Sequence, residues 1–414
     1  MRPPSFMLIA GEASGDLLAA ELVPRLQQEY LRRFVDPAPA MRPLRAASMP
    51  RFFGAGGPRM AEAGVDIMTD LTRYSAIGFS DVARNYFQYR RIFNALRNLA
   101  SEHQPDVIIG VDFSGFNRRF VRAVQKDLSR RNGCFHNWQP RMVQYVSPQV
   151  WASRPGRAVG MARDYDLLLA LFPFEKAWYA ERVPGLTVQC VGHPMIDRYE
   201  GQWSAGGPPR RPSPPLVALL PGSRSAELKR HAETMLCAAE RIGAQSDTRF
   251  VAVLPNATLA ADLDQCEAAR RLKASPGRLT IQVGNLPEVL AEATLAIAST
   301  GTVTMECAYF GVPTVALYKT TWSTYQIGRR IVKVSHLAMP NILAGETLFP
   351  EFIQHQATPA NLARAALELL RDKERRSRVR QRLAEIVASL GRGGAAERAA
   401  SGILDLLQGT PRLR

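Results

Sequence analysis

The sequence predicts an α/β protein with two Rossmann-like, doubly wound domains. Short apolar runs alternate with longer helical patterns through most of the 414 residues, and this alternation is typical of parallel strands that helices bury on both faces. The alternation stops at one segment rich in glycine and proline and then starts again. A chain of this length with 46% hydrophobic residues also exceeds what one core usually holds, so two domains are expected.

The first domain is expected over residues 1–200. Its predicted strands are the apolar runs FMLIA, PDVIIGVD, MVQYVS, DLLLALFP and TVQCVG. Helices are predicted to follow the first two runs, from Leu17 and from Asn117. Residues 201–215 (GQWSAGGPPRRPSPP) are so dense in glycine and proline that we interpret them as the linker between the domains.

The second domain is expected over residues 216–414. Its predicted strands are LVALLPGSR, FVAVLP, LTIQVG, LAIAST and PTVALY, with helices between them. From Asn361 onward the apolar periodicity is helical, which predicts packed helices that close this domain or cross back to the first. Ligands of such sheets bind beyond the carboxyl ends of the strands, so the two domains are expected to face a cleft.

Composition and charge indicate the cellular compartment of the protein and the kind of partner it binds. The five cysteines are scattered, odd in number and without a C-x-x-C pair, which predicts a reducing compartment and no structural metal. The N-terminal apolar run, residues 6–10, is too short for a signal peptide or a membrane span, so a cytoplasmic protein is expected. A net charge of +16 favours anionic partners: nucleic acid, an anionic membrane leaflet or phosphorylated substrates.

The first predicted strand leads into two glycines and a serine, Gly11 to Asp16 (GEASGD), directly before a helix. Such a turn suits an anion or a close backbone approach, and a plain tight turn is the alternative. The spacing is not G-x-G-x-x-G, and no acidic residue follows a second strand at the expected distance. A dinucleotide-dependent dehydrogenase is therefore disfavoured.

This turn is the first in a series of motifs that spans nearly the whole chain. In order they are GEASGD, GAGGPRM, PDVIIGVDFSGFN, VQYVSPQVWASRPGR, LFPFEKAWY, VGHP, LLPGSRSAEL, GTVTMECA and MPNILAG. Their order resembles that of the lipid-A-disaccharide synthase family, inverting glycosyltransferases of the two-domain GT-B fold. The resemblance implies transfer of 2,3-diacylglucosamine from its UDP derivative to 2,3-diacylglucosamine 1-phosphate. The products would be the β-1,6-linked disaccharide 1-phosphate and UDP, with no cofactor. A homodimer is compatible with the resemblance.

Asp112 ends the predicted strand 107–111 at the carboxyl edge of the first domain. A carboxylate there can take the proton of an acceptor hydroxyl, and the resemblance implies that Asp112 is the catalytic base. The alternative is that Asp112 caps the next helix. The family commonly has a second acid where this chain has Gly115, which leaves Asp112 alone.

The nucleotide is expected in the second domain. Ser223 and Arg224 follow the first strand of that domain and open a helix, so backbone N–H groups and a guanidinium can meet one diphosphate. Gly301 and Thr302 precede Glu306 by about one helical turn. The carboxylate of Glu306 then points back towards the helix start, where it can accept from ribose hydroxyls. A buried, paired glutamate is the alternative.

Five further contacts rest mainly on the resemblance. Ser14 and Gly15 are expected to approach the donor from the first domain, and Asn341 and Gly345 to lie in a nucleotide-contact loop. His193 follows a strand in VGHP. It is expected to contact the sugar or the other domain, or to be a hydrogen-bonded structural histidine, with equal weight.

A metal-dependent alternative rests on the string Asp164-Tyr165-Asp166. This Asp-x-Asp precedes its strand and should lie at the amino edge of the sheet, away from the ligand site. We therefore predict transfer without a metal.

Membrane contact is predicted for the segment 78–99, where aromatic and basic residues interleave. Phe79, Phe87, Arg90 and Arg91 are the proposed contacts of an interfacial helix. The alternative is a core helix with a solvated basic face. A lipid acceptor favours the interfacial interpretation, and with it a peripheral protein on the inner face of the inner membrane of a Gram-negative-type bacterium.

Two rival functions remain at this stage. A UDP-sugar 2-epimerase of the same fold would need neither a second sugar nor an apolar surface. A nucleic-acid-binding protein would explain the charge, but the sequence contains no recognised binding motif, and no nucleic-acid partner is expected.

Overall fold

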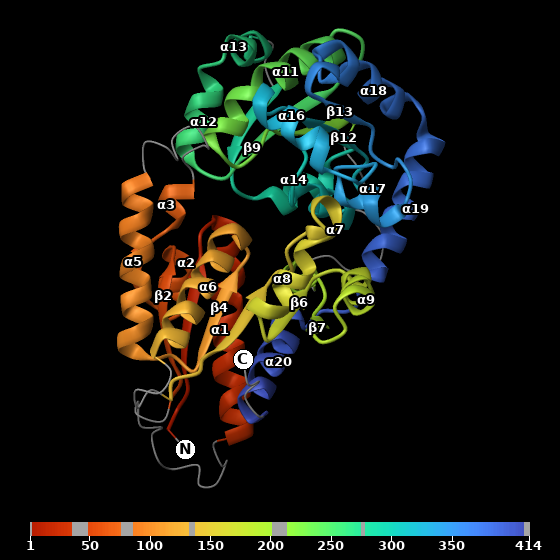
Figure 1. Ribbon diagram of the computed structural model, residues 1–414. Coiled ribbons are helices and arrows are strands. Elements are labelled where there is room, and N and C mark those ends of the chain that lie inside the picture. Colours follow the sequence, from red (N-terminus) through yellow and green to blue (C-terminus); the bar gives the residue numbers. More distant parts are fainter. Residues whose placement is uncertain are drawn as a thin grey trace, which may run out of the picture. The chain divides into compact units, whose positions relative to one another are not determined.

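The computed structural model describes residues 2–34, 49–75, 86–131, 137–200, 213–274 and 278–409. The chain divides into two compact units (Figure 1). The first unit comprises Met1–Glu200 and Leu390–Arg414, and the second comprises Gly201–Ser389.

A sheet of seven strands forms the centre of the first unit within the described residues, in the order β3-β2-β1-β4-β5-β6-β7. All neighbouring strands are parallel. The strands are β1 (Ser5–Ala10), β2 (Arg51–Gly56), β3 (Asp66–Asp70), β4 (Val107–Val111), β5 (Arg141–Tyr145), β6 (Leu167–Ala170) and β7 (Thr187–Cys190).

Helices lie on both faces of this sheet (Figure 1). They are α1 (Ala13–Phe34), α2 (Pro58–Glu62), α3 (Thr72–Ser75), α5 (Tyr86–His103), α6 (Ser114–Arg131), α7 (Val150–Ser153), α8 (Arg157–Asp164), α9 (Pro173–Arg182), α10 (Pro194–Tyr199) and α20 (Ala395–Gln408). The strands β1, β4 and β5 are almost entirely buried, which explains why they are apolar runs and not alternating ones.

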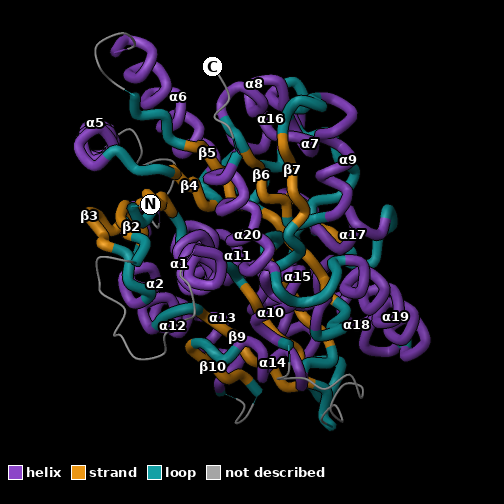
Figure 2. The backbone as a smooth tube through the Cα atoms, turned by 90° about the horizontal axis from the view of Figure 1, so that it is seen from below, coloured by secondary structure: helices purple, strands orange, loops and turns teal. Residues whose placement is uncertain are grey.

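The last helix belongs to the first unit. α20 packs along α1 (Figure 2), and ion pairs join the two helices, including Arg25 to Glu397 at 2.9 Å and Arg33 to Asp405 at 2.5 Å. The sequence left open whether the terminal helix stays with the second domain or crosses back, and in the structure it packs on α1.

The second unit has a parallel sheet of six strands in the part of the chain that the structure describes, in the order β10-β9-β8-β11-β12-β13. The strands are β8 (Leu216–Leu220), β9 (Arg249–Leu254), β10 (Leu279–Val283), β11 (Leu295–Ser299), β12 (Thr314–Tyr318) and β13 (Glu351–Ile353). Its core combines strand residues such as Leu219 and Ile297 with helix residues such as Met235 and Leu362.

The helices of the second unit again cover both faces of its sheet (Figure 1). They are α11 (Ser225–Gly243), α12 (Ala257–Asp264), α13 (Glu267–Lys273), α14 (Leu286–Glu292), α15 (Val303–Tyr309), α16 (Trp322–Ile331), α17 (Met339–Ala344), α18 (Pro359–Arg371), α19 (Lys373–Ser389) and the 3-10 helix Gln354–Gln356.

The predicted fold class is confirmed: both sheets are parallel and covered by helices. Three strands, β2, β3 and β13, were not predicted. Most of the expected linker, residues 201–212, lies outside the described residues.

Each sheet has one point where the strand order changes direction. In the first sheet β1 is followed along the chain by β2 on one side, and β4 then pairs with β1 on the other side. In the second sheet β8 and β11 meet in the same way. Ligands of open α/β sheets bind outside the carboxyl ends of the strands at such points, so these two places define where a site is expected.

Candidate active site

Three of the predicted residues meet at the switch point of the first sheet. Ser14 and Gly15 begin α1 directly after β1, and Asp112 directly follows β4. The Ser14 hydroxyl donates to Oδ2 of Asp112 at 3.2 Å. A Cβ on Gly15 would lie 3.1 Å from the Val111 carbonyl and 3.5 Å from Cβ of Asp112, so glycine lets α1 start close to β4.

The backbone at Asp112 is held in an unusual conformation. Asp112 and Phe113 have φ values of 50° and 38°, in the left-handed region that side chains other than glycine rarely adopt. The Asp112 N–H donates to the Tyr145 carbonyl at 2.8 Å. Strained residues of this kind persist only where the surroundings enforce them, and they concentrate at functional sites.

Two buried amide side chains hold the backbone of Asp112 in this conformation. The Asp112 carbonyl accepts from Asn117 at 2.9 Å and from Gln144 at 2.7 Å. The Gln144 amide oxygen accepts in turn from the Tyr165 hydroxyl at 3.1 Å. A Cβ on Gly110 would come within 2.8 Å of both amide side chains, so only glycine at position 110 leaves room for the two amides.

The helix-cap alternative for Asp112 has little support. Among the described residues, no hydrogen bond joins its carboxylate to the first turn of α6. The Asn117 N–H of that turn bonds to the Phe113 carbonyl instead, at 3.2 Å. The carboxylate is only partly buried and is held by Ser14, as a base that must meet a substrate requires.

The last residue of GEASGD has a structural role. Asp16 is buried, and its carboxylate accepts from the backbone N–H groups of Gly57 at 2.8 Å and of Arg59 and Met60, both at 3.1 Å. These N–H groups open α2. A Cβ on Gly57 would lie 2.6 Å from Oδ2 of Asp16, so two motifs of the resemblance, GEASGD and GAGGPRM, are fixed by one carboxylate.

In the second unit, Ser223 and Arg224 lie in the loop from β8 to α11. Gly222 has a φ of 119°, a conformation that requires glycine. Both oxygens of Glu227 close the loop: one accepts from the Ser223 N–H and the other from the Arg224 guanidinium, each at 3.1 Å. The Arg224 side chain is 43% exposed, so its guanidinium remains accessible to an anion.

His231 of α11 contacts this loop and was not singled out in the sequence analysis. Its buried ring lies with Nδ1 2.9 Å from the Pro221 carbonyl, and Nε2 accepts from the Lys319 N–H at 3.1 Å. The bonds require a neutral ring protonated on Nδ1, and burial lowers the pKa of His231 accordingly. The histidine thus ties the loop after β8 to the segment after β12.

Gly301, Thr302 and Glu306 follow β11, the neighbour of β8. Thr302 is the N-cap residue of α15, and Glu306 lies in the first turn of that helix. Its side chain is partly buried. Because β8 and β11 run parallel side by side, Arg224 and Glu306 emerge at the same edge of the second sheet.

Two predicted contacts in the loop 339–345 have structural roles. Asn341 is fully buried, and its amide donates to Phe349 and Glu351 at 2.8 and 2.7 Å. Its oxygen accepts from the Leu348 and Phe349 N–H groups at 2.9 and 2.8 Å. The side-chain amide therefore has no hydrogen-bonding capacity left for a nucleotide. Gly345 ends α17 with a φ of 68°.

His193 is the N-cap residue of α10, and its Nδ1 accepts from the Met195 N–H at 3.3 Å. Burial, together with the nearby Arg198 charge, lowers the pKa of His193 to about 4. This geometry fits the structural interpretation. Nearby, burial raises the pKa of Glu175 to about 7 although its carboxylate accepts from Phe172 and Trp151.

The Asp-x-Asp string is engaged in structural bonds. Asp164 accepts from the guanidinium groups of Arg118 and Arg122, and Asp166 accepts from the Met142 N–H at 2.7 Å. Within the described ranges, no group of three or more His, Cys, Asp or Glu side chains is placed to hold a metal ion.

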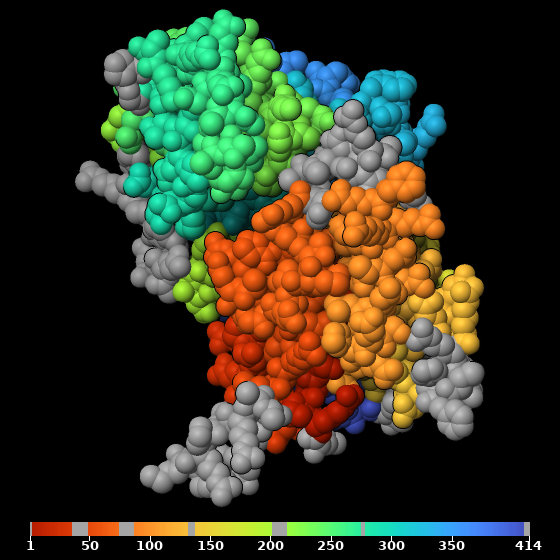
Figure 3. Space-filling view, turned by 90° about the vertical axis from the view of Figure 1, so that its left-hand side faces the viewer, coloured from red at the N-terminus to blue at the C-terminus, as the bar shows by residue number. Residues whose placement is uncertain are grey.

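The predicted membrane segment is partly a core helix. Ile92, Leu96 and Ala100 of α5 are buried in the core of the first unit, whereas Phe87 is 79% exposed and Arg90 and Arg91 are exposed. The exposed side of α5 contributes to the orange surface in Figure 3. Phe79 lies outside the described residues. In the part of the chain that the structure covers, no helix combines the length and apolar character needed to cross a bilayer.

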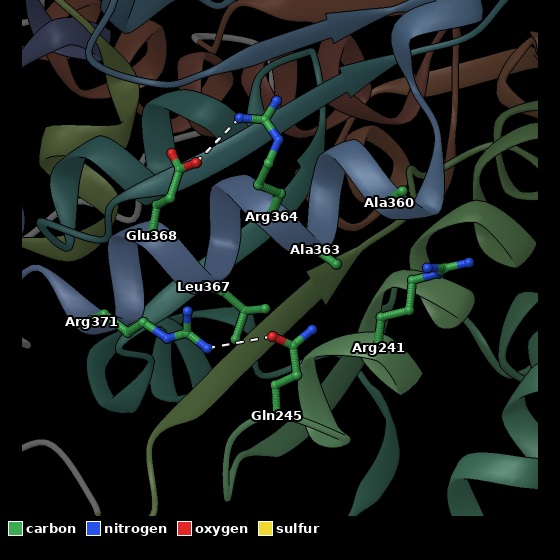
Figure 4. Close-up of a pocket in the computed structure, with 8 residues that line it drawn as sticks. All are labelled: Arg241, Gln245, Ala360, Ala363, Arg364, Leu367, Glu368 and Arg371. Atoms are coloured by element: carbon green, nitrogen blue, oxygen red, sulfur yellow. Dashed lines mark hydrogen bonds and ion pairs between the residues drawn. The ribbon is translucent and has the colours of Figure 1, made fainter.

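A surface pocket of about 320 Å³ lies on the second unit, away from the switch point of its own sheet (Figure 4). It is formed by α18 and the C-terminal part of α11, the end opposite to Arg224. Two of its three arginines have partners in the pocket: Arg364 bonds to Glu368 at 3.2 Å, and Arg371 to Gln245 at 3.4 Å. We do not count it as part of the candidate site.

The fold resembles that of solved glycosyltransferases and sugar-nucleotide epimerases. The glycosyltransferase of kitacinnamycin matches with a TM-score of 0.61 at 17% identity, covering 98% of this chain and 100% of that chain. UDP-GlcNAc 2-epimerase from Neisseria meningitidis, bound to UDP-GlcNAc, matches with a TM-score of 0.55 at 12% identity over 98% and 100%. By fold, the protein therefore belongs to the GT-B class.

Sequence similarity then identifies the family. The model of the lipid-A-disaccharide synthetase family matches residues 6–401. Lipid-A-disaccharide synthase from Trichlorobacter lovleyi is 34% identical over 98% of both chains, and that from Geobacter sulfurreducens is 36% identical over 97% of both. The chain belongs to the lipid-A-disaccharide synthetase family and is a glycosyltransferase, which confirms the resemblance seen in its motifs.

Proposed function

We propose that this glycosyltransferase moves 2,3-diacylglucosamine from its UDP derivative to 2,3-diacylglucosamine 1-phosphate, forming a β-1,6 linkage. The proposal is supported by the side chains that lie at the switch points of the two sheets. A strained, serine-held carboxylate lies at one, and an accessible arginine with a first-turn glutamate lies at the other. The first suits an acceptor hydroxyl, and the second suits a nucleoside diphosphate.

The reaction is a single displacement with inversion. The 6-hydroxyl oxygen of the acceptor bonds to the anomeric carbon of the donor while the bond from that carbon to the diphosphate oxygen breaks. The hydroxyl proton passes to Asp112, and the bonding electron pair leaves with UDP. Arg224 and the N–H groups at the start of α11 stabilise the charge that develops on the diphosphate.

The nucleotide contacts in this proposal are Ser223, Arg224, Gly301, Thr302 and Glu306. Ser14 and Gly15 contribute to the sugar side, and His231 positions the loop that carries Arg224. Asn341 is dropped because its amide is saturated by internal bonds. We further propose that transfer needs no metal and that the protein acts at the inner leaflet of the inner membrane.

The proposal is tested by assaying the purified protein with donor and acceptor together and with each alone. UDP and the disaccharide 1-phosphate should form in equal amounts only when both substrates are present. UDP should also raise the melting temperature, because a ligand of the native state stabilises it. Release of UDP without disaccharide would contradict the proposal.

The epimerase rival shares only the fold with this chain. An epimerase would turn over UDP-N-acetylglucosamine alone, without an acceptor. We expect no such turnover, and its detection would favour the rival.

A further inference from the structure

Helix α16 exposes its apolar side chains. None of its ten residues, Trp322–Ile331, is buried. Trp322 is 73% exposed and Ile327 58%, and Val332, directly after the helix, is 38% exposed. Large apolar side chains grouped in this way on one short element mark an interaction surface more often than single exposed ones do.

The same helix is basic. From residue 319 to 345 the chain carries Lys319, Arg329, Arg330 and Lys333 and no Asp or Glu. A helix turns by about 100° per residue, so Arg330 projects between Trp322 and Ile327. Arg329 stacks over Tyr325 at 5.8 Å. Cationic, aromatic and aliphatic groups are thus interleaved on one exposed surface.

Local bonds start this helix, and none of its residues is buried. The Thr321 hydroxyl caps it by accepting from the Thr324 N–H at 3.3 Å, and Gln354 holds the Thr320 backbone through both its N–H and its carbonyl. Helices shorter than about 12 residues are marginal in water without packing. The helix therefore gains stability from any surface that covers its apolar residues.

We infer that α16 is an interfacial helix that binds an anionic lipid surface. Trp322 and Ile327 would insert between the head groups, while Arg329, Arg330 and Lys333 would contact lipid phosphates. The inference deepens the proposed peripheral binding and rests on it for the choice of lipid. It assigns that binding to the second unit, in addition to the α5 surface of the first unit.

Co-sedimentation with vesicles of phosphatidylglycerol and phosphatidylcholine tests this inference. The variant Trp322→Ser with Ile327→Ser should bind at least about tenfold more weakly than the wild type. Arg329→Ser with Arg330→Ser should lose about fivefold in vesicle affinity for each charge, and salt should weaken binding of the wild type similarly.

Val283→Ser, at a side chain 46% exposed in the same unit, is the apolar control. Arg375→Ser with Arg378→Ser, on α19 of the same unit, is the charge control. Neither control should change binding.

The UDP-dependent rise in melting temperature and turnover in detergent micelles should be unchanged in all these variants. Neither of these two measurements needs a bilayer, so they distinguish a failure of this inference from a failure of the proposed function. Unchanged vesicle binding in both α16 variants would overturn the inference, as would a wild type that does not bind anionic vesicles. Loss of binding only in Phe87→Ser with Arg91→Ser would assign the contact to α5 alone. Retention of a DNA oligonucleotide in place of vesicles would assign α16 to a nucleic acid.

Discussion

The hydroxyl of Ser14 lies 3.2 Å from Oδ2 of Asp112, and the two residues belong to segments 98 positions apart. They meet because β1 and β4 are parallel neighbours whose carboxyl ends lie at the same edge. The hydrogen bond fixes the orientation of the carboxylate, which is what a general base needs before the acceptor arrives.

Ser14→Ala should reduce turnover at saturating substrate about three- to thirtyfold, because the carboxylate keeps its charge but loses its orienting donor. Steady-state rates measure this effect. Ser129→Ala is the matched control, since the Ser129 hydroxyl bonds only within α6, to the Lys126 carbonyl at 3.0 Å. A Ser14→Ala rate within twofold of wild type would remove this bond from the mechanism.

Arg224→Ala and Glu306→Ala should each weaken UDP binding at least about tenfold, for different reasons. The arginine is assigned to the diphosphate and the glutamate to the ribose. Calorimetry should therefore show that Arg224→Ala spares uridine binding, whereas Glu306→Ala weakens uridine and UDP alike. Arg241→Ala, on the same helix as Arg224, should change neither affinity. UDP affinities equal to wild type in both site variants would place the nucleotide elsewhere.

His193→Asn should gain stability relative to the wild type as the pH falls. The pKa of His193 is about 4 in the folded protein and about 6.5 when unfolded. Between these values the unfolded chain binds a proton that the native state does not, so the wild type loses stability as the pH falls. Asparagine keeps the N-cap acceptor and does not titrate.

Urea unfolding of both proteins at pH 7 and pH 5 measures this effect. The difference in unfolding free energy should shift by about 1–2 kcal/mol in favour of the variant. The wild type alone cannot show this effect, because the raised pKa of Glu175 stabilises the wild type as the pH falls over nearly the same range. The difference between the wild type and His193→Asn isolates the contribution of His193. A pH-independent difference would contradict the assignment of His193 as a neutral ring.

Activity should survive dialysis against EDTA within about twofold. The expectation rests on the structural bonds of Asp164 and Asp166, which tie the Asp-x-Asp string to α6 and β5 of its own unit. Rates before and after chelation, with magnesium added back, test it. Inactivation that magnesium reverses would show that a metal takes part.

The sequence predicted strands best where burial is complete. β4, β8 and β11 are buried throughout, so each appears as an uninterrupted apolar run. β2 escaped prediction because Gly54 and Gly56 interrupt RFFGAG, and glycine weakens a strand pattern. β3 was missed because it is a half-exposed edge strand, and β13 because it has three residues.

The site was predictable to the extent that it follows strand ends. Three candidate residues follow apolar runs or open helices: Asp112, Arg224 and Glu306. Because the strands are parallel, these positions place each of them at the carboxyl edge of its sheet. The two amides that hold Asp112 were not predictable, because Asn117 lies in a helix and Gln144 in a strand. A motif also does not reveal that the Asn341 amide is buried and saturated.

The most direct test of this account is the rate of disaccharide formation by Asp112→Asn, measured together with its affinity for UDP. The amide preserves the shape and the Ser14 contact but cannot accept the acceptor's proton. The account predicts a rate about two to four orders of magnitude below wild type, with UDP affinity unchanged because the proposed nucleotide contacts lie in the second unit. A variant that binds UDP normally and retains more than about a tenth of the wild-type rate would contradict the role of Asp112 as the base.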